Sequence, residues 1–444
     1  MKSYIRFFFA TLLIGSLGMA QTIAESYEVG TWPGFRSAAI SFTFDDNDLN
    51  QLAVVVPMFN SFDFKLTLFT LTGTGTGWRD PNWSGLKAAA EQGHEIASHT
   101  VTHPYLNQIT MEEQKSELED SYNTITSNIP GINGLTLAYP FCVKGNDSLL
   151  SQYYIGARGC QGIIDKSTPN DLMNISSIVC GTEGSVRTAA NFNSRADAAV
   201  NSKGICVFLI HGVDDDGGWS PTESSELQSH LEYLKANNNK FWVATFGNIV
   251  RYIAERNAVS IAETDVQDNT ITLQVTDTLE DVIYNVPVSI RRVLPDDWPF
   301  AAVTQNGGDV AVRLKVIDEI KYLQFDIVPD AGAVVLSKAA LSGIQGIETD
   351  KQPKFLLSQN YPNPFNPETT IIFQLPETAF VSLKIMNMLG QEVVTINQQQ
   401  YVAGEHRVTW DGKDAKGNIV SSGTYFCRLT AGEISLMRKM TIVR

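Results

Sequence analysis

Apolar positions between residues 37 and 256 follow two spacings in turn. Short, mostly apolar runs, as at 39–44 and 205–210, are typical of buried strands. The segments between such runs place apolar residues three or four positions apart, as at 84–92 and 224–236, which indicates helices packed against a sheet. Strands that alternate with helices predict a parallel sheet with crossover helices. For a segment of this length we expect an α/β fold, a distorted (β/α) barrel.

Local capping signals support two of these helices. Thr110, followed three residues later by Glu113, predicts a capping box at the start of a helix that extends to about Ile129. Gly93 follows the helix predicted at 84–92, and glycine is the commonest residue just beyond a helix end.

After Val259 the pattern changes to alternation of apolar and polar residues. Ile271, Leu273 and Val275 share one face of a predicted strand, and similar strands follow at 310–316 and 323–327. This pattern predicts an all-β module over residues 259–341, a small sandwich whose role the sequence does not define. Residues 342–354 are polar and predict a linker.

The C-terminal part, residues 355–444, is again rich in predicted strands. Val381, Leu383 and Ile385 lie on one strand face, and Tyr425, Cys427 and Leu429 lie on another. The fold class is therefore an α/β domain followed by two small all-β sandwich-like modules.

The N-terminus has the pattern of a secretory signal peptide. Lys2 and Arg6 are followed by an almost unbroken apolar run from Phe7 to Ala20, which ends on small residues. A membrane anchor is the alternative, but the run is shorter than the roughly twenty residues that a span requires. We predict a signal peptide at residues 1–20, an α/β domain at residues 21–258 and a secreted, extracellular or cell-surface protein with no stable membrane span.

Composition narrows the classes of partner. The chain has 33 Lys and Arg against 48 Asp and Glu, a formal net charge of −15. This balance argues against nucleic acid, because phosphate binding needs a concentrated basic surface. The five cysteines are too few for a disulfide scaffold and form no C-x-x-C zinc pattern. Export permits disulfides, and an odd number leaves at least one thiol unpaired, but the pairing stays open.

Candidate chemical groups follow three of the predicted strands. Asp45 and Asp46 end the strand in SFTFDDN, His99 and His103 follow a later strand in HEIASHTVTHPYL, and His211 ends the strand in VFLIHG. The carboxyl ends of parallel strands meet on one face of the fold, where such enzymes place their sites. We therefore expect these five side chains to be neighbours.

One carboxylate and two imidazoles suit a hydrolytic metal site with an open position for water. Asp46, His99 and His103 are the candidate ligands, and the four-residue spacing of the histidines predicts that both lie on one side of a helical turn. Zinc is the metal that we expect, because it lowers the pKa of a bound water. Asp45 is then a candidate general base and His211 a candidate general acid.

Each element alone has a simpler interpretation. With 6 histidines in the chain, a pair four residues apart arises by chance in roughly one sequence of this composition in ten, so the pair itself is weak. An Asp-Asp pair after a strand is commonly a helix cap, and His211 before Gly212 is compatible with an ordinary loop. The joint arrangement at three strand ends is much more specific than any one part.

At these positions the chain resembles the polysaccharide deacetylases, also called NodB-homology or carbohydrate esterase family 4 domains, over roughly residues 37–256. The TFDD segment matches the family's first motif, SHTVTH its second and LIH its fifth. The resemblance implies that Asp45 is the catalytic base, that Asp46, His99 and His103 bind the metal, that Leu209 contacts the acetyl methyl group and that His211 is the acid.

Two motifs fit less well. The third is typically R-x-P-[YF], and here it is Ala138-Tyr139-Pro140-Phe141. The resemblance implies that Tyr139 and Phe141 bind substrate, with the Phe141 N–H on the oxyanion, but the Arg that usually orients the base is replaced by Ala138. Without that cation, the pKa of Asp45 is expected to lie higher than usual. No clear fourth motif is present. Residues 156–159 are a candidate for the strand that carries the fourth motif. The aspartate of that motif is either replaced by Asp214, Asp215 or Asp216 or absent.

Residues 355–444 resemble the C-terminal sorting domain of type IX secretion substrates. YPNPFNP, MLGQEV, W-D-G-x-D-x-x-G and SSGTYFCRL fit that pattern. The resemblance implies an immunoglobulin-like sandwich and the type IX secretion machinery as a partner. A carbohydrate-binding accessory module is the alternative.

Together, these features predict a secreted, zinc-dependent hydrolase that removes acetyl groups from a polysaccharide of the N-acetylglucosamine type. An acetyl xylan esterase is one alternative, and a non-catalytic glycan-binding surface protein on the same fold is the other. The glycan, the position of the acetyl group, the physiological metal and the oligomeric state are not defined by the sequence.

Overall fold

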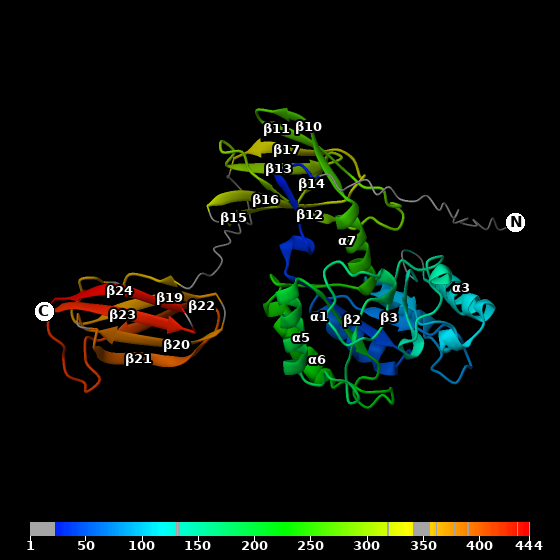
Figure 1. Ribbon diagram of the computed structural model, residues 1–444, viewed down its shortest axis with the longest axis horizontal. Coiled ribbons are helices and arrows are strands. Elements are labelled where there is room, and N and C mark those ends of the chain that lie inside the picture. Colours follow the sequence, from blue (N-terminus) through cyan, green and yellow to red (C-terminus); the bar gives the residue numbers. More distant parts are fainter. Residues whose placement is uncertain are drawn as a thin grey trace. The chain divides into compact units, whose positions relative to one another are not determined.

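The computed structural model describes residues 23–340 and 356–443, apart from positions 130, 132, 133, 318, 361, 377, 389 and 433 (Figure 1). The predicted signal peptide, residues 1–20, and the predicted linker, residues 342–354, lie outside the described residues. None of the described helices is both long and apolar enough to cross a membrane.

A parallel sheet with helices packed on it forms the α/β domain, which confirms the predicted fold class. Its strand order is β6-β5-β4-β3-β2-β8-β7, with β9 pairing with β2. Every pairing between these strands is parallel. The strands are β2 (Ala38–Asp45), β3 (Thr67–Thr70), β4 (Glu95–Ser98), β5 (Thr136–Ala138), β6 (Gly156–Arg158), β7 (Ile178–Val179), β8 (Ile205–Ile210) and β9 (Phe241–Val243).

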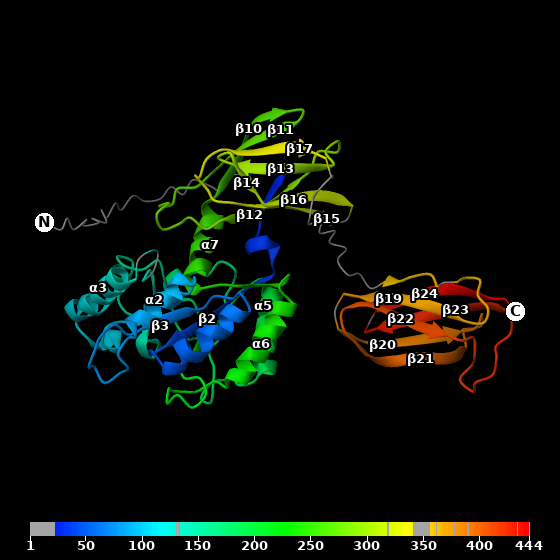
Figure 2. The same cartoon turned by 180° about the vertical axis from the view of Figure 1, so that it is seen from behind.

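The sheet curves into a half-barrel. Its two edge strands, β6 and β7, do not pair with each other, but the segment just before β7 bridges to β6 between Ile175 and Arg158. The helices of this domain are α1 (Val56–Ser61), α2 (Trp83–Glu91), α3 (Met111–Asn128), α4 (Asp147–Leu150), α5 (Ala189–Ser202), α6 (Ser224–Ala236) and α7 (Phe246–Ala258). Figure 2 shows α5 and α6 beside β2.

Alternation along β2 separates the core from the site. Phe42 and Phe44 belong to the main apolar cluster under the helices, together with Phe208 of β8. Thr43 and Asp45 point to the opposite, inner face, because successive strand residues face opposite sides. Every residue of β2 is buried on one side or the other, and the polar residues Ser41, Thr43 and Asp45 all lie on the inner face.

Both capping predictions are confirmed. The Thr110 hydroxyl accepts a hydrogen bond from the Glu113 N–H, and the Glu113 carboxylate accepts one from the Thr110 N–H, so α3 begins with a capping box. Gly93 has a φ of +89° just beyond the end of α2, a conformation that favours glycine.

The middle module is a two-sheet sandwich with one strand from the N-terminus. Its sheets have the orders β1-β12-β16-β15 and β10-β11-β17-β13-β14. Strand β1 (Tyr27–Val29) pairs antiparallel with β12, so these residues join the middle module although we predicted residues 21–258 as the α/β domain. The other strands are β10 (Ser260–Gln267), β11 (Thr270–Thr276), β12 (Val288–Val293), β13 (Phe300–Gln305), β14 (Gly308–Val310), β15 (Val312–Ile317), β16 (Ile320–Ile327) and β17 (Val334–Ala339).

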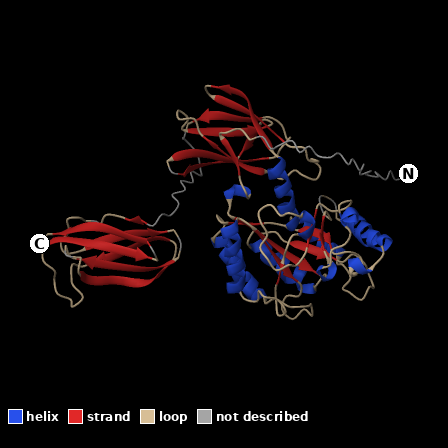
Figure 3. Cartoon of the chain, in the orientation of Figure 1, coloured by secondary structure: helices blue, strands red, loops and turns tan. Residues whose placement is uncertain are grey.

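The C-terminal module also has two antiparallel sheets, β18-β19-β22 and β21-β20-β23-β24. Figure 3 shows it, like the middle module, as strands and loops. Its strands are β18 (Leu356–Leu357), β19 (Thr369–Leu375), β20 (Ala379–Met386), β21 (Glu392–Tyr401), β22 (Gly404–Trp410), β23 (Gly423–Ala431) and β24 (Ile434–Ile442). The chain divides into two compact units, one with the α/β domain and most of the middle module, the other with the C-terminal module and residues 314–322.

One disulfide joins two loops of the half-barrel. Cys142 follows β5 and Cys160 follows β6, and their Cα atoms lie 5.7 Å apart. Cys180, Cys206 and Cys427 are free and buried. The prediction of at least one unpaired thiol is confirmed. The sequence left the pairing open, and the structure pairs Cys142 with Cys160.

We expect Cys160→Ser to lower the free energy of unfolding of the α/β domain by about 3 kcal/mol, because the cross-link closes a short loop in the unfolded chain. Chemical denaturation with and without a reductant measures this change. Reductant should destabilise the wild type by a similar amount and leave Cys160→Ser unchanged. An equal effect of reductant on both proteins would contradict the pairing.

Candidate active site

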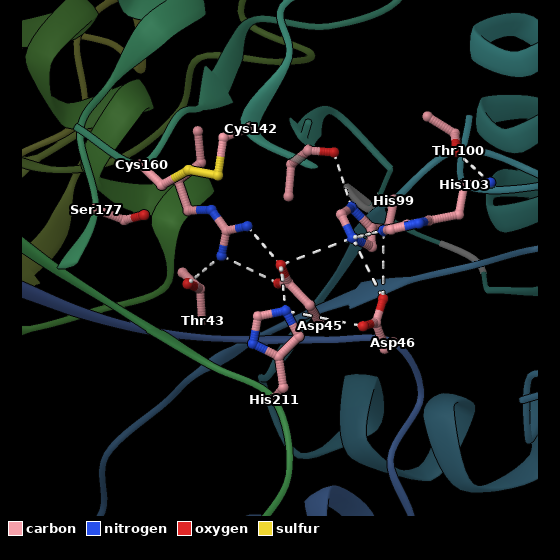
Figure 4. Close-up of polar contacts among 12 residues, drawn as sticks. Thr43, Asp45, Asp46, His99, Thr100, His103, Cys142, Cys160, Ser177 and His211 are labelled. Carbon is pink, nitrogen blue, oxygen red and sulfur yellow. Dashed lines mark hydrogen bonds and ion pairs between the residues drawn. A yellow bond between two sulfur atoms is a disulfide. The ribbon is translucent and has the colours of Figure 1, made fainter. Parts of the chain in front are cut away.

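The five predicted side chains lie together at the carboxyl ends of the strands (Figure 4). Asp45 is the last residue of β2 and Asp46 follows it, while His99 follows β4 and His211 follows β8. His103 is on the loop after His99. All five side chains are buried or nearly so, and they come from three segments that lie far apart in the sequence. The predicted convergence is therefore observed.

Asp46, His99 and His103 form a candidate metal site. Asp46 Oδ1 lies 3.4 Å from His99 Nε2 and 3.7 Å from His103 Nε2, and the two Nε2 atoms are 3.2 Å apart. Each residue offers one ligand atom within 4.8 Å of the others. Asp46 Oδ1 is buried and has no hydrogen-bond partner among the described residues, which is what a metal ligand requires before the ion is added.

The protonation of the two imidazoles also suits a metal. His99 Nδ1 lies 2.9 Å from the carbonyl oxygen of Ala138, an arrangement that fixes the proton on Nδ1 and leaves Nε2 free as a ligand. Burial, together with the neighbouring His99, lowers the pKa of His103 to about 4, so this ring is neutral at pH 7. Burial lowers the pKa of His99 as well, but the carboxylates of Asp45 and Asp46 outweigh burial and leave it raised. The pocket thus favours positive charge.

The two histidines lie on a loop, so the prediction of a helical turn was wrong. Thr100 and His103 have φ values of +70° and +62°, which interrupt any helix. The carboxylate of Glu117, from α3, accepts hydrogen bonds from the N–H groups of Val101 and Thr102 at 2.8 and 2.9 Å. These bonds hold the loop in a conformation that turns His103 back toward His99.

Asp45 is held by a different partner, Arg158. The guanidinium binds both carboxylate oxygens, with Nη1 3.0 Å from Oδ1 and Nη2 2.5 Å from Oδ2. Arg158 Nη1 also donates to the hydroxyl of Thr43 at 2.9 Å. Burial raises the pKa of Asp45, but Arg158, His99 and His211 outweigh burial and hold the pKa below its ordinary value. The expectation that Asp45 lacks a cationic partner was wrong.

Arg158 was not predicted from the sequence, because the cation was expected on β5 and Arg158 lies on β6. Ala138 occupies the position of the expected Arg on β5, and Arg158 is its direct neighbour on β6 in the parallel register. Residues 156–158 form a strand that is completely buried, and an arginine in such a strand needs a carboxylate. That requirement was the available signal.

His211 faces both aspartates from β8. Its Nε2 lies 4.0 Å from Asp45 Oδ2 and 3.8 Å from Asp46 Oδ2, and its Nδ1 is buried without a hydrogen-bond partner among the described residues. Burial outweighs the two carboxylates and lowers the pKa of His211.

None of the three aspartates proposed as a substitute for the fourth motif serves His211. Asp214 Oδ1 accepts from the N–H of Ser224 at 2.8 Å, so this carboxylate is used at the start of α6. Asp216 accepts from the N–H groups of Val213 and Gly218 and folds its own loop. Asp215 is exposed.

The three predicted substrate-binding residues have different surroundings. Phe141 is 43% exposed, and its ring lies 4.4 Å from that of His103. Leu209 is buried on the strand face that also carries His211, since the two are separated by one residue. Tyr139 lies in an apolar cluster, and its hydroxyl donates to the Met173 carbonyl at 2.6 Å. The prediction that Tyr139 contacts substrate was wrong, because its side chain is part of the core.

Exposed aromatic side chains surround the site. The ring of Trp78 lies 4.2 Å from His103, and that of Trp219 lies 4.7 Å from His211. Tyr105 stacks on Phe141 at 3.9 Å. A cavity of 340 Å³ lies between Asp46, Trp78 and Trp219. A larger cavity of 790 Å³, also lined by Trp78, adjoins it. The arrangement suits a substrate with flat apolar faces.

Two parts of the chain match known families. Residues 34–158 match the family model for polysaccharide deacetylase, which confirms the predicted deacetylase domain over that part of the chain. Residues 363–433 match the model for the FlgD Ig-like domain, in agreement with the immunoglobulin-like sandwich predicted there.

The chain is also similar to individual proteins. A gellan lyase of Bacillus sp is 29% identical over 350 residues, 73% of this chain and 14% of that protein, so the chain spans about one seventh of that relative. The Xyl-CE4 domain of a multidomain xylanase from the Trinervitermes trinervoides hindgut metagenome is 18% identical with a TM-score of 0.34, covering 48% of this chain and 89% of that one. The peptidoglycan deacetylase PdaC of Bacillus subtilis is 17% identical with a TM-score of 0.32, covering 48% and 89%.

We expect Arg158→Met to lower the free energy of unfolding by about 3–5 kcal/mol at pH 7, because it leaves the Asp45 carboxylate buried without its cation. The pKa of Asp45 is depressed in the folded state, so the pairing stabilises the fold above the ordinary carboxyl pKa and is lost as the pH falls. The penalty of Arg158→Met should therefore shrink in acid. Denaturation of this variant, of Asp45→Asn and of the double variant measures the coupling, and additive effects would refute it.

Proposed function

We propose that this protein is a secreted, zinc-dependent deacetylase that hydrolyses acetyl groups of a polysaccharide of the N-acetylglucosamine type. The observation that carries the proposal is the division of labour between two adjacent carboxylates. Asp46 faces the imidazoles of His99 and His103, while Asp45 is bound by Arg158. A hydrolase needs this separation, because a ligand cannot serve at the same time as a free proton acceptor.

The donor set favours zinc among divalent metals. One carboxylate and two imidazoles form a common zinc ligand set that leaves a position open for water. When bound at Asp46, His99 and His103, the ion would polarise the acetyl carbonyl and lower the pKa of a water molecule.

The remaining steps fall to the residues of the chain. Asp45, kept ionised by Arg158, accepts a proton from the attacking water. The Phe141 N–H is the proposed donor to the oxyanion, and Leu209 contacts the acetyl methyl group. His211, across from Asp45, delivers a proton to the departing nitrogen or oxygen as acetate leaves.

The surroundings of the site support a sugar polymer as substrate. Trp78, Tyr105, Phe141 and Trp219 are each between 38% and 52% exposed, and three of their rings contact the histidines of the site. Aromatic rings bind the apolar faces of pyranose sugars through the same dispersion contacts that they make with one another. The two cavities beside Trp78 provide room on one side of the site.

Metal content tests the proposed ligands. We expect His103→Ala to lose zinc and hydrolytic activity together, because two protein ligands do not hold zinc in a defined site. His103 is on a surface loop, so the fold should survive, and circular dichroism checks this. His94→Asn, a change at a histidine outside the cluster, is the control and should keep full metal content. Stoichiometric zinc in His103→Ala would contradict the ligand assignment.

Acetate release tests the reaction. We expect the zinc-loaded protein to release acetate from N-acetylglucosamine polymers, and Asp45→Asn to reduce kcat by about a hundred- to ten-thousandfold with metal retained. Little change in KM is expected, because Asp45 is buried and its carboxylate is bound by Arg158. Acetate release from acetylated xylan alone would favour the esterase alternative. Binding of glycans with no acetate release from any of them would favour the non-catalytic alternative.

We also propose that residues 355–444 direct the protein through the type IX secretion machinery. The match of residues 363–433 to an Ig-like domain and the YPNPFNP and SSGTYFCRL segments support this proposal. The Cys142–Cys160 disulfide supports export, since disulfides persist in oxidising compartments.

Deletion of residues 354–444 tests the sorting proposal in the native host. The module has its own core, so the purified truncated protein should keep its activity. In the host, the truncated protein should accumulate in the periplasm, as measured by cell fractionation. Its normal appearance outside the cell would identify the module as an accessory.

A further inference from the structure

Arg79 connects the two loops that line the smaller cavity beside the candidate active site. The Trp78 loop, residues 71–82, joins β3 to α2, and the Trp219 loop, residues 211–223, joins β8 to α6. The tryptophans after which these loops are named both line the 340 Å³ cavity. Arg79 has no part in the proposed proton transfers, so its contacts between the two loops need a separate explanation.

The guanidinium of Arg79 has a partner in each of two other segments. Its Nε donates to Asp48 Oδ1 at 3.0 Å, and its Nη2 donates to the carbonyl oxygen of Asp216, in the Trp219 loop, at 2.6 Å. Asp48 follows β2 and is only 5% exposed, and Asp46 and Asp216 are its charged neighbours. Arg79 therefore supplies a cation to an acidic group and ties the Trp78 loop to both other segments.

The Trp78 loop has little packing around its glycines. Gly75 and Gly77 have φ values of +66° and +93°, and a Cβ atom added at either would meet no atom of the described residues within 4 Å beyond its chain neighbours. The end of the loop is held more firmly, because Asn47 Nδ2 donates to the Arg79 carbonyl oxygen at 2.9 Å. Trp78 thus lies between a loosely packed stretch and a fixed residue, so its position depends on Arg79.

The Trp219 loop packs on the same ion pair of Asp48 and Arg79. A Cβ atom at Gly217, where φ is +78°, would lie 3.3 Å from Arg79 Nη2. A Cβ atom at Gly218 would lie only 2.2 Å from Asp48 Oδ2. The two glycines therefore allow the backbone of this loop to approach the ion pair closely. The pair defines where both loops lie.

We propose that Arg79 is a positioning residue that fixes the spacing between Trp78 and Trp219 and thereby the affinity of the site for a sugar polymer. This inference rests on the proposed function, which gives the two rings a substrate to bind. Trp78 lies 4.2 Å from the ring of His103 and Trp219 lies 4.7 Å from that of His211, so both are placed to contact a sugar that reaches the site. Loss of Arg79 should therefore weaken substrate binding more than it slows the chemical step.

The balance between KM and kcat tests this role. With the full-length, zinc-loaded protein and N-acetylglucosamine polymers, Arg79→Met should raise KM about five- to tenfold, as expected for a misplaced aromatic contact, and should change kcat much less. Arg187→Met, at an exposed arginine of the same domain, is the control and should behave like the wild type. An unchanged KM in Arg79→Met, with or without a fall in kcat, would overturn the proposal.

A double variant shows whether Arg79 acts through the loops or contacts the substrate itself. In Trp78→Ala one of the two rings is missing, so the spacing between them no longer matters. Arg79→Met should then add little to the rise in KM that Trp78→Ala causes alone. Multiplication of the two effects would assign Arg79 a contact of its own with the substrate and would overturn the positioning role.

Fluorine NMR tests the position of Trp78 without any reaction. In the full-length protein labelled with 5-fluorotryptophan, the signal of Trp78 is the one that Trp78→Phe removes. Arg79→Met should shift this signal toward that of the free amino acid and narrow it, because the loop gains freedom. Arg79→Lys keeps a charge beside Asp48 but lacks the fork that reaches two partners, so it should cause the same change with less risk to the fold.

These measurements separate the failure of this inference from the failure of the proposed function. An unchanged Trp78 signal in Arg79→Lys and Arg79→Met would overturn the role of Arg79, whatever the protein hydrolyses. If Arg79→Met does not fold, as judged by circular dichroism, Arg79→Lys decides both the NMR and the kinetic test. A wild type that releases acetate from no glycan would instead refute the proposed function, and the Trp78 signal would still show whether Arg79 holds the loop.

Discussion

The bidentate pair between Asp45 and Arg158 is the interaction on which the rest of the site depends. Asp45 is almost completely buried on the inner face of the half-barrel, and a carboxylate placed there is stable only with a cation beside it. Arg158 provides this cation and binds Thr43 as well, so it joins β2 to β6 across the inside of the sheet. Because Arg158 binds Asp45, the carboxylate of the next residue, Asp46, faces His99 and His103 instead.

Much of the fold was predictable because its causes are local. The buried strand at residues 205–210 is continuously apolar and that at residues 39–44 is mostly apolar, and Thr110 with Glu113 marks a helix start by a pair of hydrogen bonds within one turn. The convergence of Asp45, His99 and His211 was also predictable, because parallel strands bring their carboxyl ends to one edge. In these cases the residue type and its position along the chain are enough to predict the local structure.

The features that were missed depend on pairs of residues that are distant in the sequence. Arg158 replaces an arginine expected at Ala138, and only the register of β5 against β6 makes the two positions equivalent. Tyr139 is adjacent to residues of the site, but the Met173 carbonyl draws its hydroxyl into the core. The loop of His99 and His103 is bent by Glu117, which lies on α3. Spacing along the chain contains none of this information.

The pairing of β1 with β12 makes the α/β domain an insertion in the middle module. Glu28 lies opposite Arg291 in the sheet, and the entire half-barrel lies between these two residues in the sequence. During synthesis the first strand of the middle module therefore emerges long before its partner, and that sheet is completed only after the intervening domain has been made. The half-barrel and the sandwich are consequently nested, and a cut at residue 259 would separate a strand from its own sheet instead of dividing two independent modules.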